Sequence, residues 1–208
     1  SMLVQALYNV VDSIFVAQIS EDALAALSLA FPMQNFMIAV GTGLGVGINA
    51  LISRSLGERR NDLANRYAMQ GLLLELISYL IFLGVGLFAA GPFIAAQAAG
   101  DSAILDYGTT YLTICCVGSI GFFIQITMER ILQSTGRTMY TLATQSIGAV
   151  INIVLDPILI FGLLGAPKMG VAGAALATII GQLIAGALAL LFNLKVNHDV
   201  RLHPKLLR

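Results

Sequence analysis

The chain has 208 residues, of which 58% are hydrophobic and 11% charged, and its formal net charge is zero. A soluble domain carries roughly 45–50% apolar and about 25% charged residues, so this composition indicates an integral membrane protein. The neutral balance gives no basic surface for nucleic acid. The apolar runs are longer than the ~10-residue alternating strands of outer-membrane barrels, so the expected fold class is an all-α membrane protein.

Six apolar segments follow one another along the chain, separated by short polar turns. A helix needs about 20 apolar residues to cross a bilayer, so we predict a bundle of six transmembrane helices. Proline lacks the backbone N–H, so Pro32 should kink the second helix, and Gly91 and Pro92 should end the third. Asp22 is the predicted N-cap of the second helix. The predicted helices span residues 1–19, 23–56, 64–90, 103–133, 139–164 and 171–192.

Four glycines alternate along the second predicted helix, at positions 41, 43, 45 and 47. No strand precedes them, so they do not form a dinucleotide-binding turn. On a helix they make two overlapping GxxxG pairs, Gly41 with Gly45 and Gly43 with Gly47. Such pairs allow helices to approach closely in membranes, and we expect both pairs to serve helix packing.

The basic residues fall almost entirely on one side of the predicted topology. Ten of the eleven Lys and Arg residues lie in or beside the loops that follow the second, fourth and sixth helices, and only Lys168 lies on the other side. Positive residues concentrate in cytoplasmic loops. We therefore predict a multi-pass protein of the cell (inner) membrane, with these three loops in the cytoplasm.

The fifth predicted helix carries a carboxylate at membrane depth. Asp156 lies inside an apolar run, where an ionisable residue is by default a candidate functional site. Pro157 leaves the carbonyl of Ile153 without its helical partner, so we expect a kink there. Asn152 lies one turn earlier on the same face. Carboxylate, amide and carbonyl oxygens together suit a cation or a proton.

A second carboxylate is expected at the same depth in the first helix. Tyr8, Asn9 and Asp12 recur at helical spacing on one side of this helix. Asp12 and Asp156 each lie eight residues before the outer end of their predicted helices, or about 12 Å below it at ~1.5 Å per residue. Two carboxylates at one level could share a proton or a cation.

Two further acidic residues lie within predicted helices. Glu75 in the third helix is either a buried partner or close to an interface. Glu129 follows Gln125 by one turn near the end of the fourth helix, where it could extend to the interface, form a pair or line a transport path. Cys115 and Cys116 lack a CxxC spacing, so we expect them to pack rather than to bind metal.

Three stretches together resemble the multidrug and toxic compound extrusion (MATE) transporters, most closely the DinF-like branch: Leu7–Asp12, Ala23–Pro32 and Asn152–Pro157. The resemblance runs over the whole chain and implies one six-helix lobe of a two-lobe (6+6) transporter. It implies an N-terminal lobe over residues 1–193, with its first helix truncated. Residues 194–208 would be a cytoplasmic linker toward a second lobe.

The resemblance also implies the site residues. The family's cation site matches Asp12, Asn152 and Asp156, with Thr178 as the matching threonine of the sixth helix; these residues would bind Na⁺ in a sodium-coupled member. Tyr8 matches a tyrosine of the same cavity. The polar residues expected to line the substrate cavity are Tyr8, Asn9, Gln34, Gln125, Gln145 and Gln182.

The implied function is cation-coupled efflux of organic cations and amphipathic toxic compounds by alternating access. The coupling ion is Na⁺ or H⁺, no other cofactor is expected, and the chain is not expected to be an enzyme. The implied partners are small-molecule drugs, the lipid bilayer and a second six-helix lobe. The sequence leaves the ion and the substrate open.

Three alternatives compete with this function. A lipid-linked saccharide flippase of the same superfamily would place basic residues inside the lobe, but none of the eleven Lys and Arg residues falls mid-helix. An intramembrane aspartyl protease needs two carboxylates that share a proton. Its usual marks, Tyr-Asp and Gly-x-Gly-Asp, are absent from the predicted spans. A structural membrane subunit that does not transport is the third alternative.

Overall fold

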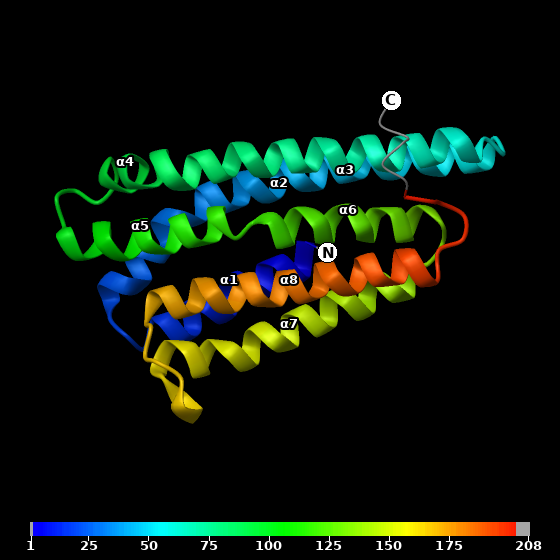
Figure 1. The fold of residues 1–208 in the computed structure, drawn as a ribbon. Coiled ribbons are helices and arrows are strands. Elements are labelled where there is room, and N and C mark those ends of the chain that lie inside the picture. The colour runs from blue at the N-terminus through cyan, green and yellow to red at the C-terminus, as the bar shows by residue number, and fades with distance from the viewer. Residues whose placement is uncertain (1, 203–208) are drawn as a thin grey trace.

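The computed structural model describes residues 2–202, without the side chains of residues 2 and 5, and these residues fold into one helical bundle (Figure 1). Residues 203–208, the end of the predicted linker, lie outside the described part of the chain. The elements are, in chain order, α1 (Met2–Val16), α2 (Glu21–Gly57), α3 (Asn61–Gly84), η1 (Val85–Ala89), α4 (Ala90–Ala95), α5 (Ser102–Val117), α6 (Ile120–Ser134), α7 (Thr138–Phe161), η2 (Leu163–Gly165) and α8 (Val171–Lys195).

The helices match the six predicted segments. Four helical runs are long and apolar enough to cross a membrane: α2, residues 61–95, α7 and α8. A fifth span is formed by α5 and α6 together, which are bent by 44° at their junction, and α1 is a shorter apolar helix. The helices lie side by side along the long axis of the bundle (Figure 1). The prediction of an all-α membrane fold is therefore confirmed.

The third helix does not end at Gly91 and Pro92, as the sequence predicted. It continues through the π-helical turn η1 and through α4 to Ala95. Pro92 has no N–H, so the carbonyl of Phe88 lacks its usual helical hydrogen bond. The π-helical turn η1, which is wider than an α-helical turn, accommodates this missing hydrogen bond without ending the helix. Glycine at position 86 lets this turn lie against α5, because a Cβ there would be 2.6 Å from the Cβ of Cys116.

The fourth predicted helix is not continuous. α5 ends at Val117 and α6 begins at Ile120, and the hydroxyl of Ser119 donates to the carbonyl of Cys116 at 2.7 Å. A side-chain bond of this kind competes with the backbone ladder. Gly118 lies against α8, because a Cβ there would be 2.1 Å from Ile179 Cδ1. The bend between α5 and α6 lets this span pack against α8 at Gly118.

The N-terminus of α2 is capped by Ser20 and not by Asp22. The Ser20 hydroxyl accepts a hydrogen bond from the N–H of Ala23 at 3.1 Å, and the helix begins at Glu21. α2 then runs through Pro32 without ending, just as α7 runs through Pro157. The kink angles at both prolines stay predictions.

Only one of the two glycine pairs on α2 serves helix packing. A Cβ on Gly41 would lie 2.7 Å from the ring of Phe122, and one on Gly45 would lie 3.0 Å from Arg130 Cγ. A Cβ on Gly43 or Gly47 would have no atom of the described residues within 4 Å. Residues two apart on a helix point in nearly opposite directions, so the same contact cannot use both pairs. The packing prediction is confirmed for the first pair and wrong for the second.

Close packing of α7 and α8 brings together the helices that carry the predicted site. A Cβ on Gly181 would lie only 2.8 Å from the carbonyl oxygen of Gly148. α7 ends at Phe161 instead of the predicted Leu164, because Gly162 adopts a left-handed conformation (φ 73°) that ends the helix. The small residues Gly148 and Gly181 thus allow the polar face of α7 to lie directly against that of α8.

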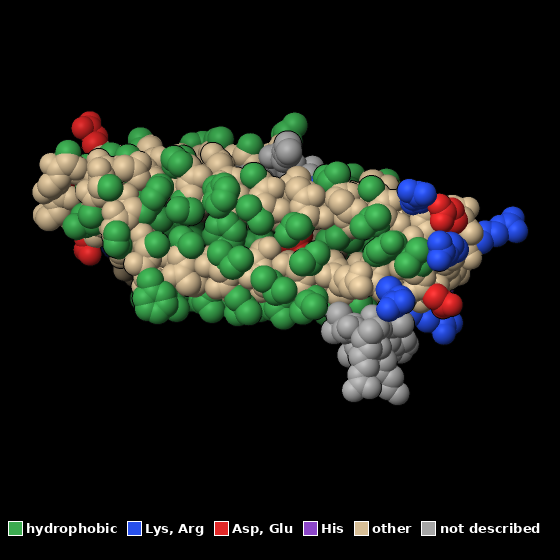
Figure 2. Space-filling view, turned by 90° about the horizontal axis from the view of Figure 1, so that it is seen from above, with side chains coloured by type: hydrophobic (Ala, Val, Ile, Leu, Met, Phe, Trp, Pro, Cys, Tyr) green, Lys and Arg blue, Asp and Glu red, His purple; other side chains and the backbone are tan. Residues whose placement is uncertain are grey.

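The outer surface of the bundle is apolar along its length. Leu80, Ile81 and Phe88 are 55%, 61% and 81% exposed. Figure 2 shows hydrophobic side chains along the sides of the molecule and the Lys and Arg side chains of that face gathered at one end. A bilayer covers such a surface in a multi-pass membrane protein, since lipid tails are apolar and the charged ends reach water.

Candidate cation site

The carboxylate of Asp12 on α1 is completely buried and accepts hydrogen bonds from three other helices. Oδ2 accepts from the Tyr111 hydroxyl of α5 at 2.8 Å and from the Thr178 hydroxyl of α8 at 3.0 Å. Oδ1 accepts from the amide of Asn152 on α7 at 3.4 Å. The Asn152 amide also donates to Thr178 at 3.3 Å. Neutral donors thus stabilise this carboxylate without a basic partner.

Asp156 lies beside Asp12 but has a different environment. Its side chain is also completely buried, and its carboxylate interacts electrostatically with that of Asp12. Among the described residues, neither Asp156 oxygen receives a hydrogen bond, and the same holds for the amide oxygen of Asn152. Three buried oxygens on neighbouring turns of α7 therefore have no donor among the described residues. A buried carboxylate with no donor needs a proton or a cation to be stable.

The four predicted ion-site residues are therefore brought together, and they come from α1, α7 and α8. Asp12, Asn152, Asp156 and Thr178 are each at most 7% exposed. Pro157 has no N–H, so the carbonyl of Ile153 on the same turn lacks its helical partner.

Sequence reasoning missed Tyr111, which holds the Asp12 carboxylate from α5. Its ring is fully buried, and its hydroxyl also accepts from the amide of Gln34 at 3.4 Å. Gln34 donates further to the sulfur of Cys115 at 3.3 Å. A buried tyrosine usually places its hydroxyl on a polar partner. This preference could have marked Tyr111 as a residue with a polar partner, but it does not predict that the partner is Asp12.

A third buried carboxylate, Glu129 on α6, accepts hydrogen bonds from three side chains. Its Oε1 accepts from Gln125 and from the Thr144 hydroxyl, both at 2.9 Å, and its Oε2 accepts from Gln145 at 2.7 Å. Glu129 is 2% exposed, so it does not extend to the interface. We refer to these four residues as the Glu129 cage.

Tyr8 lies between the Glu129 cage and Asp12. It is 2% exposed and interacts electrostatically with both carboxylates. A Cβ on Gly148 would lie 2.6 Å from its hydroxyl oxygen, which has no hydrogen-bond partner among the described residues. Gln182 is buried on α8, one turn after Thr178. Tyr8 therefore links two polar regions along the inside of the lobe.

The remaining predicted cavity residue, Asn9, lies elsewhere. It borders a groove of about 820 Å³ between α1 and α2, together with Asn35, Thr42 and Gly43. Four of the six predicted cavity residues are divided among three places. Gln34 binds Tyr111 beside Asp12, the glutamines at 125 and 145 belong to the Glu129 cage, and Asn9 borders the groove. The other two, Tyr8 and Gln182, are buried on α1 and α8.

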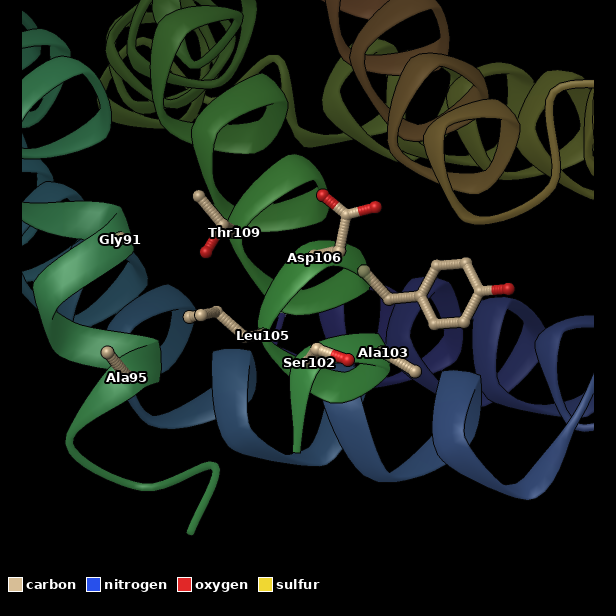
Figure 3. A pocket seen from close by; sticks show the side chains of 8 residues that line it. Gly91, Ala95, Ser102, Ala103, Leu105, Asp106 and Thr109 are labelled. Carbon is tan, nitrogen blue, oxygen red and sulfur yellow. The ribbon is translucent and has the colours of Figure 1, made fainter. Parts of the chain in front are cut away.

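Another pocket, of about 780 Å³, lies between α4 and α5 and contains none of the predicted site residues. Figure 3 shows Leu105 and Thr109 pointing toward the helix that carries Gly91 and Ala95, whereas Asp106 points away from it. With one exposed carboxylate and mostly small side chains, this pocket lacks the convergent polar groups of a ligand site.

Comparison with known families identifies the helical fold that carries this site. The MatE family model matches residues 1–158. This chain belongs to the MatE family. The expected membership in this transporter family is therefore confirmed.

Individual relatives of this MatE chain support the same assignment. The FAD transporter of Shewanella oneidensis is 29% identical over 191 residues, which cover 88% of the chain and 40% of that protein. The solved structure of the MATE multidrug transporter DinF-BH is 36% identical, with a TM-score of 0.85, over 97% of the chain and 44% of that protein.

Two more solved structures are the inward-facing and outward-facing conformations of a multidrug resistance MATE family transporter. They are 27% and 29% identical to the chain, with TM-scores of 0.85 and 0.87. Both cover 98% of the chain, and the chain covers 47% and 44% of them. The chain thus spans less than half the length of each of these relatives and has the fold of one lobe.

Proposed function

We propose that this chain is the N-terminal lobe of a cation-coupled multidrug exporter that works by alternating access. Asp12, Asn152, Asp156 and Thr178 bind the coupling ion, which is Na⁺ or H⁺. The lobe lies in the cell membrane with the loops after α2, α6 and α8 in the cytoplasm, an orientation supported by the excess of Lys and Arg in them.

The observation that carries the proposal is the open carboxylate of Asp156 beside the satisfied carboxylate of Asp12. The buried oxygens without donors belong to Asp156 and Asn152, and oxygens of this kind fit either ion. A bound Na⁺ would compensate one of the two carboxylate charges by coordination, as a proton would by a covalent bond. The role of Asp12 is then to keep its charge next to the exchanging position.

The same interior favours cationic substrates. The buried titratable acids on the described spans are Asp12, Glu75, Glu129 and Asp156. The groove between α1 and α2 is apolar at Val10 and Val46 and carries the amides of Asn9 and Asn35. We propose that a second lobe covers this groove and completes a cavity for organic cations.

The similarity to an FAD transporter raises an anionic substrate as a second candidate. A nucleotide diphosphate is recognised by basic side chains and helix N-termini. No Lys or Arg is among the fully buried residues of the described spans, and Arg130, the most interior of them, is half-buried near the end of α6. The same observation disfavours an anionic lipid-linked saccharide.

The proposal is tested on the chain reconstituted in lipid nanodiscs. Binding of radioactive Na⁺ and proton uptake after a pH step are measured for the wild type, for Asp156→Asn and for the exposed control Asp106→Asn. We expect saturable uptake of one of the two ions, which Asp156→Asn loses by tenfold or more and Asp106→Asn keeps. Equal uptake by the wild type and Asp156→Asn would contradict the proposal.

A further inference from the structure

Glu75 on α3 is a third kind of buried carboxylate. Its side chain is 1% exposed, and neither of its oxygens has a hydrogen-bond partner among the described residues. It lies 14 positions after the first residue of α3, or about 21 Å along the helix at ~1.5 Å per residue. This position is well inside the apolar part of the lobe, where an unpaired charge is costly.

The Glu75 side chain lines a pocket of about 210 Å³ between α3 and α6. Apart from this carboxylate, the lining is apolar or aromatic, and the remaining residues are Leu72, Leu76, Tyr79, Ile120, Phe123 and Ile124. The Tyr79 hydroxyl donates to the carbonyl of Val117 at 3.3 Å, which holds its ring beside the bend between α5 and α6. The pocket therefore has fixed aromatic walls and one acidic group.

This pocket opens toward the apolar outer surface and not toward the Asp12 site. Leu76 on its rim is 45% exposed, and neighbouring Leu80 is 55% exposed. Exposed hydrophobic side chains cover the sides of the lobe (Figure 2), where the bilayer lies. The Glu129 cage contacts α7 from α6, whereas Ile120 and Ile124 on α6 face α3. The two acidic regions thus use different faces of α6.

We propose that Glu75 binds the ammonium group of a lipophilic amine that enters from the bilayer. The carboxylate supplies the opposite charge, and the rings of Tyr79 and Phe123 can stabilise a cation placed over them. The pocket is smaller than the about 300–1,000 Å³ of a drug-sized site, so it accepts the ammonium head while the alkyl tail stays among lipid.

The chemistry of binding is a simple exchange. In the absence of an amine, a proton on the Glu75 carboxyl removes the costly charge. When the ammonium ion binds, the carboxyl releases that proton to water and an ion pair remains, so charge and atoms balance. Because the pocket is otherwise apolar, the Glu75 carboxylate is the one charged partner of the bound ammonium ion. The affinity for the amine therefore depends mainly on this carboxylate. This inference stands independently of the proposed ion site.

The test uses dicyclohexylcarbodiimide, a lipid-soluble reagent to which a carboxylic acid adds without a leaving group. The chain in lipid nanodiscs is treated with the reagent, digested and mapped by mass spectrometry. We expect an adduct on Glu75, and we expect octylammonium at saturation to reduce it tenfold or more. Octanol, the matched neutral ligand, should not protect the residue.

Variants separate this pocket from the ion site. Glu75→Gln keeps the shape and removes the charge, so it should lower octylammonium affinity tenfold or more and leave octanol binding unchanged. Protection of Glu75 should persist in Asp156→Asn. The proposal is overturned by an unlabelled Glu75, by labelling that octylammonium does not reduce, by equal protection from octanol, or by unchanged octylammonium affinity in Glu75→Gln.

Discussion

The Glu129 cage and the Asp12–Asp156 site are two buried acidic regions with opposite hydrogen-bond balance. Glu129 accepts three side-chain hydrogen bonds, at 2.7–2.9 Å. Asp12 also accepts three, but Asp156 beside it accepts none from the described residues. Burial is nearly the same at all three carboxylates. The number of donors, and not burial, is what distinguishes them.

This difference indicates where a ligand is needed. Three donors stabilise the Glu129 carboxylate by hydrogen bonding. A buried carboxylate without donors gains more from a proton or a cation. In the proposed function, Asp156 is therefore the position that exchanges an ion, and Glu129 is a hydrogen-bonded structural acid.

The largest effect on stability is expected in the Glu129 cage. Glu129→Ala leaves the amides of Gln125 and Gln145 buried without an acceptor, whereas the Thr144 hydroxyl still donates to the carbonyl of Thr141 at 2.9 Å. Each buried donor without an acceptor costs about 1–3 kcal/mol, so we expect the free energy of unfolding in detergent to fall by at least about 2 kcal/mol. Asp156→Ala removes no hydrogen bond and should cost clearly less. Equal losses in the two variants would show that donor number does not distinguish the regions.

The donor set of Asp12 is tested by Tyr111→Phe. A hydrogen bond to a charged group is worth about 1.5–3 kcal/mol, and the variant removes one without leaving a large cavity. We expect a loss of about 2 kcal/mol in the free energy of unfolding, together with weaker ion binding. Tyr107→Phe on the same helix is the control and should change neither. An unchanged ion affinity in Tyr111→Phe would show that Tyr111 does not contribute to ion binding.

The contact between the two regions is tested at Gly148. Gly148→Ala places a methyl group 2.6 Å from the Tyr8 hydroxyl and 3.0 Å from Ala185 Cβ. Overpacking of this kind costs about 1 kcal/mol or more, which thermal unfolding can measure. Gly43→Ala is the matched control, since nothing lies within 4 Å of that position. If Gly148→Ala is as stable as the control, Tyr8 is not held there.

The smallest effect is expected at an exposed acid. Glu58 accepts a hydrogen bond from Arg54 at 2.9 Å, and this guanidinium lowers the pKa of Glu58. The pair therefore adds stability above the ordinary glutamate pKa and loses it as the pH falls through the lowered value. In Arg54→Gln the pKa of Glu58 should return toward its ordinary value in an NMR titration, with little change in stability. An unmoved pKa would contradict the pairing.

The membrane fold and part of the site follow from local patterns in the sequence. Apolar runs predicted the spans, and the equal spacing of Asp12 and Asp156 from their helix ends predicted their shared depth. Asn152 followed from helical spacing and Thr178 from resemblance to the family. These features depend on one helix at a time, or on a depth that the bilayer imposes on all helices.

Other features depend on how helices cross, which local patterns do not encode. Tyr111 binds Asp12 from a helix 99 positions later in the chain, and nothing near it marks that partner. The donors of Glu129 come partly from α7. Gly91 and Pro92 resemble a helix end, yet a π-helical turn before them keeps the span continuous. In each case tertiary contacts outweighed the local preference.

Difference infrared spectroscopy most directly tests whether Asp156 is the exchangeable position. Spectra of the chain are recorded on addition of Na⁺ or of base, in a Glu75→Gln background that removes the other acid without donors. We predict that a protonated carboxyl band disappears on ion exchange, that this band is retained in Glu129→Gln, and that it is absent from Asp156→Asn. A band that persists in Asp156→Asn, or that Glu129→Gln removes, would contradict the account.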